Sequence, residues 1–263
     1  SLGLNRRQML EYQEQVLMDC REERSSIVTG QMNLFGGESE AVRETPIPSL
    51  PELERSALLQ LEHESLGLYL SGHPLEQSQW LRQLCRATPA AALSEQPDGG
   101  KVLLIVTLQH VKQHTTKKGE TMCFLTCEDQ SGSADCVVFP ALYNSVKPYL
   151  QQDAVLYLRG KISQKENAVS VLCDSVLQEE AFFRTLPQGR LCVKIDSRQT
   201  AELQQLLAVI GQHAGNVPVC FYLTDRKKML SPRGGQAVAV NSESYAALCA
   251  VVSPEQVGFL PPA

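Results

Sequence analysis

The stretch KVLLIVTLQHVKQHTTKKGETMCFLTCEDQSGSADCVVFP, residues 101–140, decides the fold of this chain. It contains three runs rich in apolar and β-branched residues, at Val102–Lys112, Met122–Glu128 and Ala134–Phe139. Polar turns that contain glycine separate these runs at 115–119 and 129–132, which is the pattern of consecutive β-hairpins. Pro140 ends the third strand, because proline cannot donate a hydrogen bond to a ladder.

The segment that follows completes a five-stranded barrel. Apolar residues recur there at helical spacing, at Leu142, Val146, Tyr149 and Leu150. Ala154–Ile162 and Ala168–Leu172 then supply two more strands. Three strands, a helix and two strands is the layout of an OB barrel, which leaves one face and its flanking loops free for single-stranded nucleic acid. The sequence therefore predicts an OB-fold domain over residues 99–178.

The alternation of side chains along the strands predicts which residues face a ligand. Aromatic and cationic side chains fall on strand faces opposite the apolar ones, next to a basic turn. Aromatic rings can stack on bases and cations can follow phosphates. The predicted nucleic-acid contacts are Lys112, Lys117, Lys118, Phe124, Tyr157, Arg159 and Lys161. The alternative is that Phe124 belongs to the core and the lysines form a solvated turn, since many OB barrels bind protein or nothing.

Composition indicates a soluble globular protein with more than one compact unit. The chain has 263 residues, of which 43% are hydrophobic and 20% charged. No apolar run reaches transmembrane length, so we expect no membrane segment. The nine cysteines form no CxxC pair, which favours reduced core cysteines in a cytoplasmic protein over a zinc site or a disulfide framework. The chain starts at Ser1 as if within a longer structure, so we expect a piece of a longer chain.

The net charge of −5 is unevenly distributed. Residues 1–100 carry 8 basic and 15 acidic side chains, whereas residues 101–165 carry 8 basic and 5 acidic ones. An acidic flank beside a mildly basic barrel favours weak, local contact with phosphates over tight general DNA binding. The barrel is expected to bind DNA when something else holds the DNA close.

The expected fold class is a multidomain α+β chain. Its segments are an N-terminal helical segment (1–29), a peptide with an acidic linker (30–51), a helical connector (52–98), the OB domain (99–178), a linker (179–188) and a small C-terminal α+β domain (189–263). Within the helical parts, apolar spacing predicts helices at Arg6–Arg24, at Leu53–Tyr69 and around Trp80–Arg86. The last domain has the order strand-helix-strand-strand-helix-strand, which fits a split βαβ arrangement.

A short apolar peptide interrupts the acidic linker. Gln31, Met32, Asn33, Leu34 and Phe35 lie between glycines, and an exposed Leu-Phe pair needs a surface on which to be buried. The pattern is the one that bacterial proteins use to dock on the ring-shaped sliding clamp, with Gln31 at the pocket rim and Leu34 and Phe35 in an apolar groove. Packing of the peptide within its own chain is the alternative.

Residues that would support catalysis are scattered. His73 lies in a Gly-His-Pro turn, where a structural capping role is expected. A nuclease or hydrolase would have to combine His73, His110 or His114 with Asp129 or Asp135, which lie on separate turns and strands without paired carboxylates. We therefore expect no catalytic residue, metal ligand or cofactor in this chain.

Three motifs in this order resemble the C-terminal third of the alpha subunit of bacterial DNA polymerase III. They are the Gly30–Gly36 peptide, the Leu66–Leu75 segment and the barrel strands from Lys101 to Phe139, extended by Pro140. The Thr-Thr-Lys-Lys-Gly turn at 115–119, Phe124-Leu125-Thr126 and Glu128-Asp129-x-Ser131-Gly132 carry the match within the barrel. The resemblance covers almost the whole chain and is loosest in the last domain.

The resemblance implies a function in chromosomal replication. It implies that residues 31–35 bind the sliding clamp, that the OB domain contacts single-stranded template, and that the last domain binds the tau subunit of the clamp loader. It also implies contact with the rest of the polymerase core and a location in the bacterial cytoplasm, at replication forks on the nucleoid. The parent would be a DNA-directed DNA polymerase using Mg²⁺ at palm aspartates, but this chain lacks such a cluster and is expected to be inert. The alternative is a free-standing OB protein that binds single-stranded DNA or tRNA.

Overall fold

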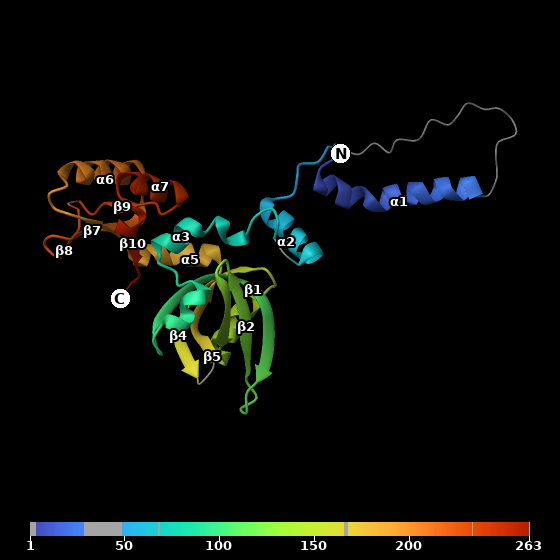
Figure 1. Cartoon of the computed structure of the whole chain (residues 1–263), viewed down its shortest axis with the longest axis horizontal. Coiled ribbons are helices and arrows are strands. Elements are labelled where there is room, and N and C mark those ends of the chain that lie inside the picture. Colours follow the sequence, from blue (N-terminus) through green and yellow to red (C-terminus); the bar gives the residue numbers. More distant parts are fainter. Residues whose placement is uncertain (1–3, 29–48, 68, 166–167, 233, 263) are drawn as a thin grey trace. The chain divides into compact units, whose positions relative to one another are not determined.

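A computed structural model describes residues 4–28, 49–67, 69–165, 168–232 and 234–262, and divides into two compact units at Ser71–Gly72. The first unit is helical, with α1 (Arg6–Val28) and α2 (Arg55–Leu66) (Figure 1). The Glu52 carboxylate accepts hydrogen bonds from the backbone N–H groups of Arg6 and Arg7. The two helices predicted for this part of the chain are confirmed.

The second unit opens with three short helices that lead into the barrel. They are η1 (Pro74–Glu76), α3 (Gln79–Leu84) and η2 (Ala90–Glu95). The Nδ1 atom of His73 accepts a hydrogen bond of 3.1 Å from the backbone N–H of Leu75, so His73 caps η1 as predicted. Burial lowers the pKa of His73. Its expected structural role is therefore confirmed.

The OB barrel is closed, and its strands run in the order β1-β2-β3-β5-β4. The elements are β1 (Lys101–Thr115), β2 (Thr121–Asp129), β3 (Gly132–Val138), α4 (Pro140–Val146), η3 (Lys147–Tyr149), β4 (Val155–Lys165) and β5 (Ala168–Leu177). Only the contact between β3 and β5 is parallel; the other pairs are antiparallel. The predicted five-stranded barrel, with its helix between the third and fourth strands, is confirmed.

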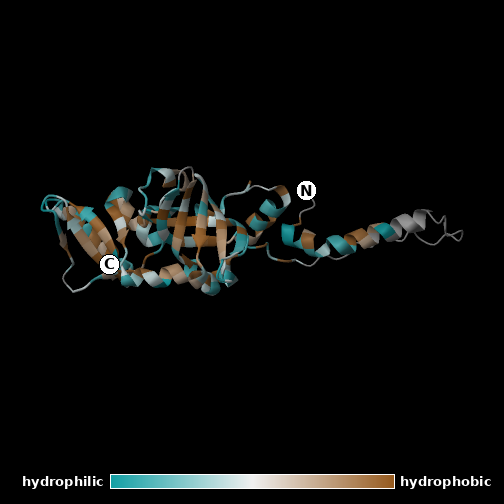
Figure 2. Cartoon of the chain, turned by 90° about the horizontal axis from the view of Figure 1, so that it is seen from below, coloured by the Kyte–Doolittle hydropathy of each residue, from teal (hydrophilic) through white to brown (hydrophobic). Residues whose placement is uncertain are grey.

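Alternating side chains fill the barrel, as the sequence pattern predicts. Leu104, Leu125, Leu156 and Leu158 point inward and are buried, and Figure 2 shows the barrel strands rich in hydrophobic residues. Gly160 lies at a bulge where β4 approaches β5. A Cβ atom there would lie 2.3 Å from the carbonyl oxygen of Leu172, so this close approach requires glycine.

The terminal domain is a small α+β structure whose sheet has the order β10-β6-β7-β8, with β9 paired separately to β7. Its elements are β6 (Arg190–Ile195), α6 (Thr200–Gln212), β7 (Ala214–Leu223), β8 (Lys228–Leu230), β9 (Ala237–Val238), α7 (Ser242–Val251), η5 (Pro254–Gln256) and β10 (Val257–Leu260). The expected α+β class is confirmed. The finer split βαβ expectation is wrong, because β6 and β7 are direct parallel neighbours with no strand between them. Element order alone does not determine whether another strand is inserted between two parallel ones.

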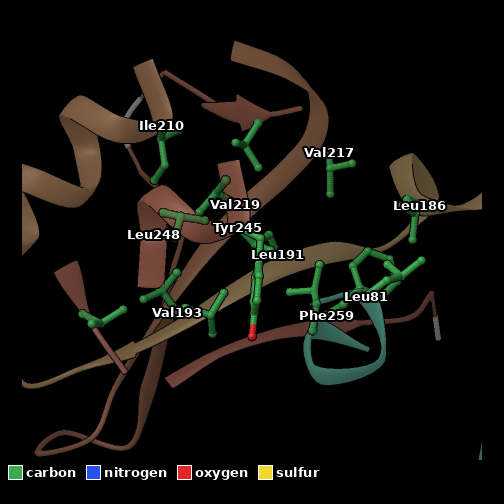
Figure 3. Packing of buried hydrophobic residues seen from close by; sticks show 14 of the residues in the cluster. Leu81, Leu186, Leu191, Val193, Ile210, Val217, Val219, Tyr245, Leu248 and Phe259 are labelled. Atoms are coloured by element: carbon green, nitrogen blue, oxygen red, sulfur yellow. The ribbon is translucent and has the colours of Figure 1, made fainter. Parts of the chain in front are cut away.

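The segment expected to be a linker, residues 179–188, is instead helical and packed. It forms α5 (Glu179–Thr185) and η4 (Leu186–Gln188), in which Phe182 and Leu186 are buried. These side chains belong to one apolar cluster that runs from the outer wall of the barrel into the core of the terminal domain. Figure 3 shows part of this cluster, with Leu81 of α3 and Leu186 near Phe259 of β10.

A buried carboxylate joins the barrel to the helices before it. Asp129, at the end of β2, forms an ion pair with Arg82 of α3 and accepts a hydrogen bond of 3.1 Å from the backbone N–H of Ala90. It also accepts hydrogen bonds from the backbone N–H groups of Ser131 (2.7 Å) and Gly132 (3.2 Å), which shapes the β2–β3 turn. The hydrogen bonds from Ser131 and Ala90 and the charge of Arg82 together lower the pKa of Asp129, against the opposing effect of burial.

We predict that Asp129→Asn lowers the free energy of unfolding at pH 7 by about 2 kcal/mol, because it removes a charged acceptor from a largely buried network. Since the folded-state pKa is below the unfolded value, this contribution is present above the unfolded pKa and is lost as pH falls through the folded pKa. Urea denaturation of the two proteins should therefore give stabilities that converge below about pH 4. A difference that stays constant between pH 7 and pH 3 would contradict this account.

Candidate nucleic-acid interface

Strand register places five residues in one line across the outside of the barrel. The paired residues are Lys112 with Phe124, Phe124 with Val137, Val137 with Leu172, and Leu172 with Lys161. Directly paired residues project from the same face of a sheet. We call Lys112, Phe124, Val137, Leu172 and Lys161 the cross-strand row.

The cross-strand row combines an apolar centre with two cationic ends. The side chain of Phe124 is 42% exposed, and Val137 and Leu172 are half-buried beside it. Lys112 and Lys161 are exposed at the two ends. Such a surface can hold bases against its apolar centre while ammonium groups contact phosphates. The structure thus brings together three of the predicted contacts, Lys112, Phe124 and Lys161.

The β1–β2 loop adds two more cations at one end of the barrel. Its shape is fixed by Thr116, whose backbone N–H donates to the carbonyl of Glu120 at 2.8 Å and whose carbonyl accepts from Gly119 at 2.9 Å. Gly119 has φ +80°, a left-handed conformation that glycine adopts without strain. Lys117 and Lys118 are exposed in this turn. The loop therefore presents both lysines to solvent, as an electrostatic contact with phosphates requires.

Acidic side chains lie on the part of this face nearer the β2–β3 turn. Asp135 is exposed and pairs in register with Thr126, whose hydroxyl lies 3.4 Å from the Asp135 carboxylate. Glu128 is also exposed, two residues further along β2. Negative charge there disfavours phosphates. Toward the β1–β2 loop this face thus carries the lysines, together with exposed Glu120 and Asp174, and toward the β2–β3 turn it carries the acidic Asp135 and Glu128.

The prediction that Tyr157 contacts nucleic acid is wrong. Its side chain is fully buried, and its ring stacks on Phe182 of α5 with the centroids 4.6 Å apart. Burial raises the pKa of Tyr157 to about 12. Arg159 faces the same helix, with its guanidinium 5.3 Å from the centroid of the Phe182 ring. We therefore place both residues at the contact with α5 and outside the candidate interface.

Sequence reasoning missed Val137 and Leu172. The alternation in β3 could have identified Val137, because Ala134, Cys136 and Val138 all face the interior. Leu172 could not be placed from the sequence, since its position beside Val137 depends on the parallel pairing of β3 with β5. Such a pairing joins strands that are distant along the chain.

The other candidate residues have separate surroundings. His110 and His114 lie exposed on β1, where the ring of His114 is 6.2 Å from that of Phe124, whereas Asp129 is buried against Arg82.

Within the described ranges, no group of three or more histidine, cysteine or acidic residues could hold a metal ion. Helices long and apolar enough to cross a membrane are likewise absent from the described part of the chain. The predicted clamp-binding peptide, which consists of Gln31, Met32, Asn33, Leu34 and Phe35, lies outside the described residues.

The cysteines are free thiols, as expected. Cys123, Cys127, Cys136 and Cys173 are buried in the barrel interior. Burial raises the pKa of the Cys123 thiol to about 11. These side chains thus fill the core as small apolar groups.

Comparison with protein families supports the barrel assignment. Residues 102–178 match the tRNA_anti-codon family, described as an OB-fold nucleic acid binding domain. A domain of replication protein A from Methanococcus maripaludis overlaps 32% of this chain and 89% of its own, with 12% identity and a TM-score of 0.28. An overlap that weak carries no inference about function.

Two curated relatives match most of the chain. The DNA polymerase III subunit alpha of Bacillus subtilis is 29% identical over 204 residues, which is 76% of this chain and 18% of the relative. That of Saccharopolyspora erythraea is 26% identical over 267 residues, covering 93% of this chain and 21% of the relative. The chain thus spans about a fifth of the length of these relatives. The closed barrel and the similarity to these relatives together show that the chain resembles the C-terminal OB region of the bacterial DNA polymerase III alpha subunit, as its sequence predicts.

Proposed function

We propose that this chain is the non-catalytic C-terminal part of a replicative polymerase alpha subunit and binds single-stranded template DNA through its barrel. The observation that carries the proposal is the cross-strand row, an exposed apolar surface with a lysine at each end, beside the loop of Lys117 and Lys118. The polymerase III alpha relatives supply the replication context. The DNA is held on the cationic part of the face, away from Glu128 and Asp135.

The same proposal includes two tethers. The peptide of residues 31–35 binds the sliding clamp, and the terminal domain binds the tau subunit of the clamp loader. Each of the contacts with the clamp, the tau subunit and DNA is weak alone. Because one chain makes all three, forming one contact raises the effective concentration for the other two. The acidic N-terminal part and the small positive balance of the barrel suit this arrangement, because the barrel needs the clamp to keep DNA near. The protein acts in the cytoplasm, at replication forks, together with the rest of the polymerase core.

A second candidate is a free-standing OB protein that binds single-stranded DNA or tRNA. The match to a family described only as an OB-fold nucleic acid binding domain favours it. This candidate also uses the cross-strand row, but it has no need of the peptide at 31–35. Clamp binding therefore separates the two functions, whereas DNA binding alone does not.

We predict that Phe124→Ala weakens binding to an oligothymidylate by about tenfold, because base–aromatic stacking contributes about 1–3 kcal/mol per base. The matched control is Tyr149→Ala, since Tyr149 is 40% exposed but lies on η3, outside the cross-strand row. Fluorescence anisotropy of the labelled oligonucleotide measures both affinities. Equal losses in the two variants, or no loss in either, would argue against the row as the binding surface.

The double variant Lys117→Gln, Lys118→Gln should reduce the salt dependence of DNA binding. Each phosphate contact on a single strand contributes about 0.7 to the slope of log K against log salt, so the slope should become shallower by about 1.4. Affinities measured between 50 and 300 mM salt test this. The control is Lys227→Gln, Lys228→Gln, which removes the same charge from the terminal domain and should leave the slope unchanged. If both doubles shift the slope alike, the effect comes from net charge rather than from the loop.

Titration calorimetry with the bacterial sliding clamp tests the tether. The parent chain should bind, and Leu34→Ala, Phe35→Ala should lose about 100-fold in affinity or more, because two large apolar side chains leave a small interface. Met32→Ala, Asn33→Ala is the comparison variant, with a smaller expected loss. Absence of binding by the parent chain would favour the free-standing OB protein.

A further inference from the structure

The terminal sheet has an open edge at β8. This strand pairs with β7, through Leu223 with Lys228, Tyr222 with Met229, and Phe221 with Leu230. Among the described residues, no strand lies on the other side of β8, which is at the end of the sheet order (Figure 1). An edge strand presents backbone N–H and C=O groups that another extended segment can use.

Two apolar side chains at this edge are uncovered. Met229 is 48% exposed and Leu230 is 49% exposed. Successive residues of a strand point to opposite faces, so the two lie on different sides of the sheet. Leu230 lies next to the buried Phe221 on the core side, and Met229 lies next to Tyr222 on the other side. An added strand would therefore cover one exposed apolar side chain on each face.

The turn that leads into β8 is cationic. Arg226, Lys227 and Lys228 are consecutive and exposed. Arg226 has a carboxylate neighbour, with its Nε 3.6 Å from Asp225, and Asp225 also accepts a hydrogen bond from the backbone N–H of Ser197. Lys227 and Lys228 form no salt bridge with another described residue. The edge thus carries two lysines that have no ion-pair partner within the described part of the chain.

These charges select among possible occupants of the edge. A second copy that paired parallel, β8 beside β8, would bring the two cationic turns together, and like charges across an interface disfavour association. An antiparallel pairing would place Lys227 and Lys228 of each copy beside Leu230 and Ser231 of the other, which offer no carboxylate. Pro232, shortly after β8, also limits how far a self-pairing could extend. An acidic segment is favoured instead, because its carboxylates would lie beside Lys227 and Lys228 and attract them. Charge complementarity therefore favours an acidic partner over a second copy.

We propose that the β8 edge binds an extended acidic segment of a partner protein as an added strand. Main-chain hydrogen bonds to β8 supply affinity, apolar side chains of the segment cover Met229 and Leu230, and its carboxylates pair with the lysines. The inference deepens the proposed tethering function, since it rests on the terminal domain being a docking domain and gives that docking a surface and a chemistry. The binding of DNA by the barrel does not depend on it.

The test uses the full chain and synthetic peptides of about ten residues, a usual strand length, in which two adjacent central valines project to opposite faces and glutamates flank them. Binding is measured by titration calorimetry at 50 mM salt. Two further peptides carry N-methyl groups on alternate amides. One peptide is methylated at the odd positions and the other at the even positions. Only every second amide of an added strand points toward the edge, so one phase should lose binding and the other should keep it within about threefold. Equal effects in both phases, or no binding by the unmodified peptide, would overturn the inference.

Charge variants give the second readout. Lys227→Glu, Lys228→Glu should weaken peptide binding by about tenfold or more, while Lys117→Glu, Lys118→Glu, an identical charge change on the barrel, should leave it unaltered. Oligothymidylate binding should show the reverse pattern. If the peptide fails to bind while DNA binding follows the barrel lysines, only this inference is refuted; if DNA binding ignores those lysines, the proposed function fails separately. Dimerisation of the chain through β8 in analytical ultracentrifugation would also overturn the inference.

Discussion

The contact on which the second unit depends is the stacking of Tyr157 on Phe182. Both side chains are fully buried, and they join the outer wall of the barrel to α5 and through it to the core of the terminal domain. Burial of large aromatic side chains of this kind contributes about 3 kcal/mol or more each. The contact therefore fixes the barrel to the terminal domain, and it also removes one barrel wall from solvent. The wall that carries the cross-strand row stays accessible to a ligand.

Much of this fold follows from local sequence patterns, whereas the site follows from them only in part. The alternation of residues in 101–140 predicts the strands, and it correctly separates inward Leu125 from outward Phe124. Alternation cannot tell whether an outward residue meets water or another helix. The prediction for Tyr157 is wrong for this reason, because the helix that covers it lies in a segment whose sequence resembles a linker. Val137 and Leu172 become neighbours only through the parallel β3–β5 pairing, which no local pattern specifies.

The distribution of charged side chains distinguishes the two proposed binding surfaces. The cross-strand row and the β1–β2 loop place four lysines around a small apolar surface, and Glu128 and Asp135 limit it on one side. A surface of this size and charge suits a few nucleotides held weakly, so the proposed tethers are needed to keep it occupied. The β8 edge provides a second, separate cationic surface with a different chemistry, in which backbone hydrogen bonds take the place of base stacking.

Locating bound DNA on the barrel tests whether the cross-strand row is the binding surface. Backbone amide spectra of the ¹⁵N-labelled chain would be recorded during titration with an oligothymidylate of about ten nucleotides, a length within the usual site size of one OB fold. We predict shifts concentrated at Lys112, Phe124, Val137 and Leu172 and in the 116–120 loop, with Tyr157 and Phe182 unchanged. Shifts that instead cluster around α5 or in the terminal domain, or no shifts at all, would contradict binding through the cross-strand row.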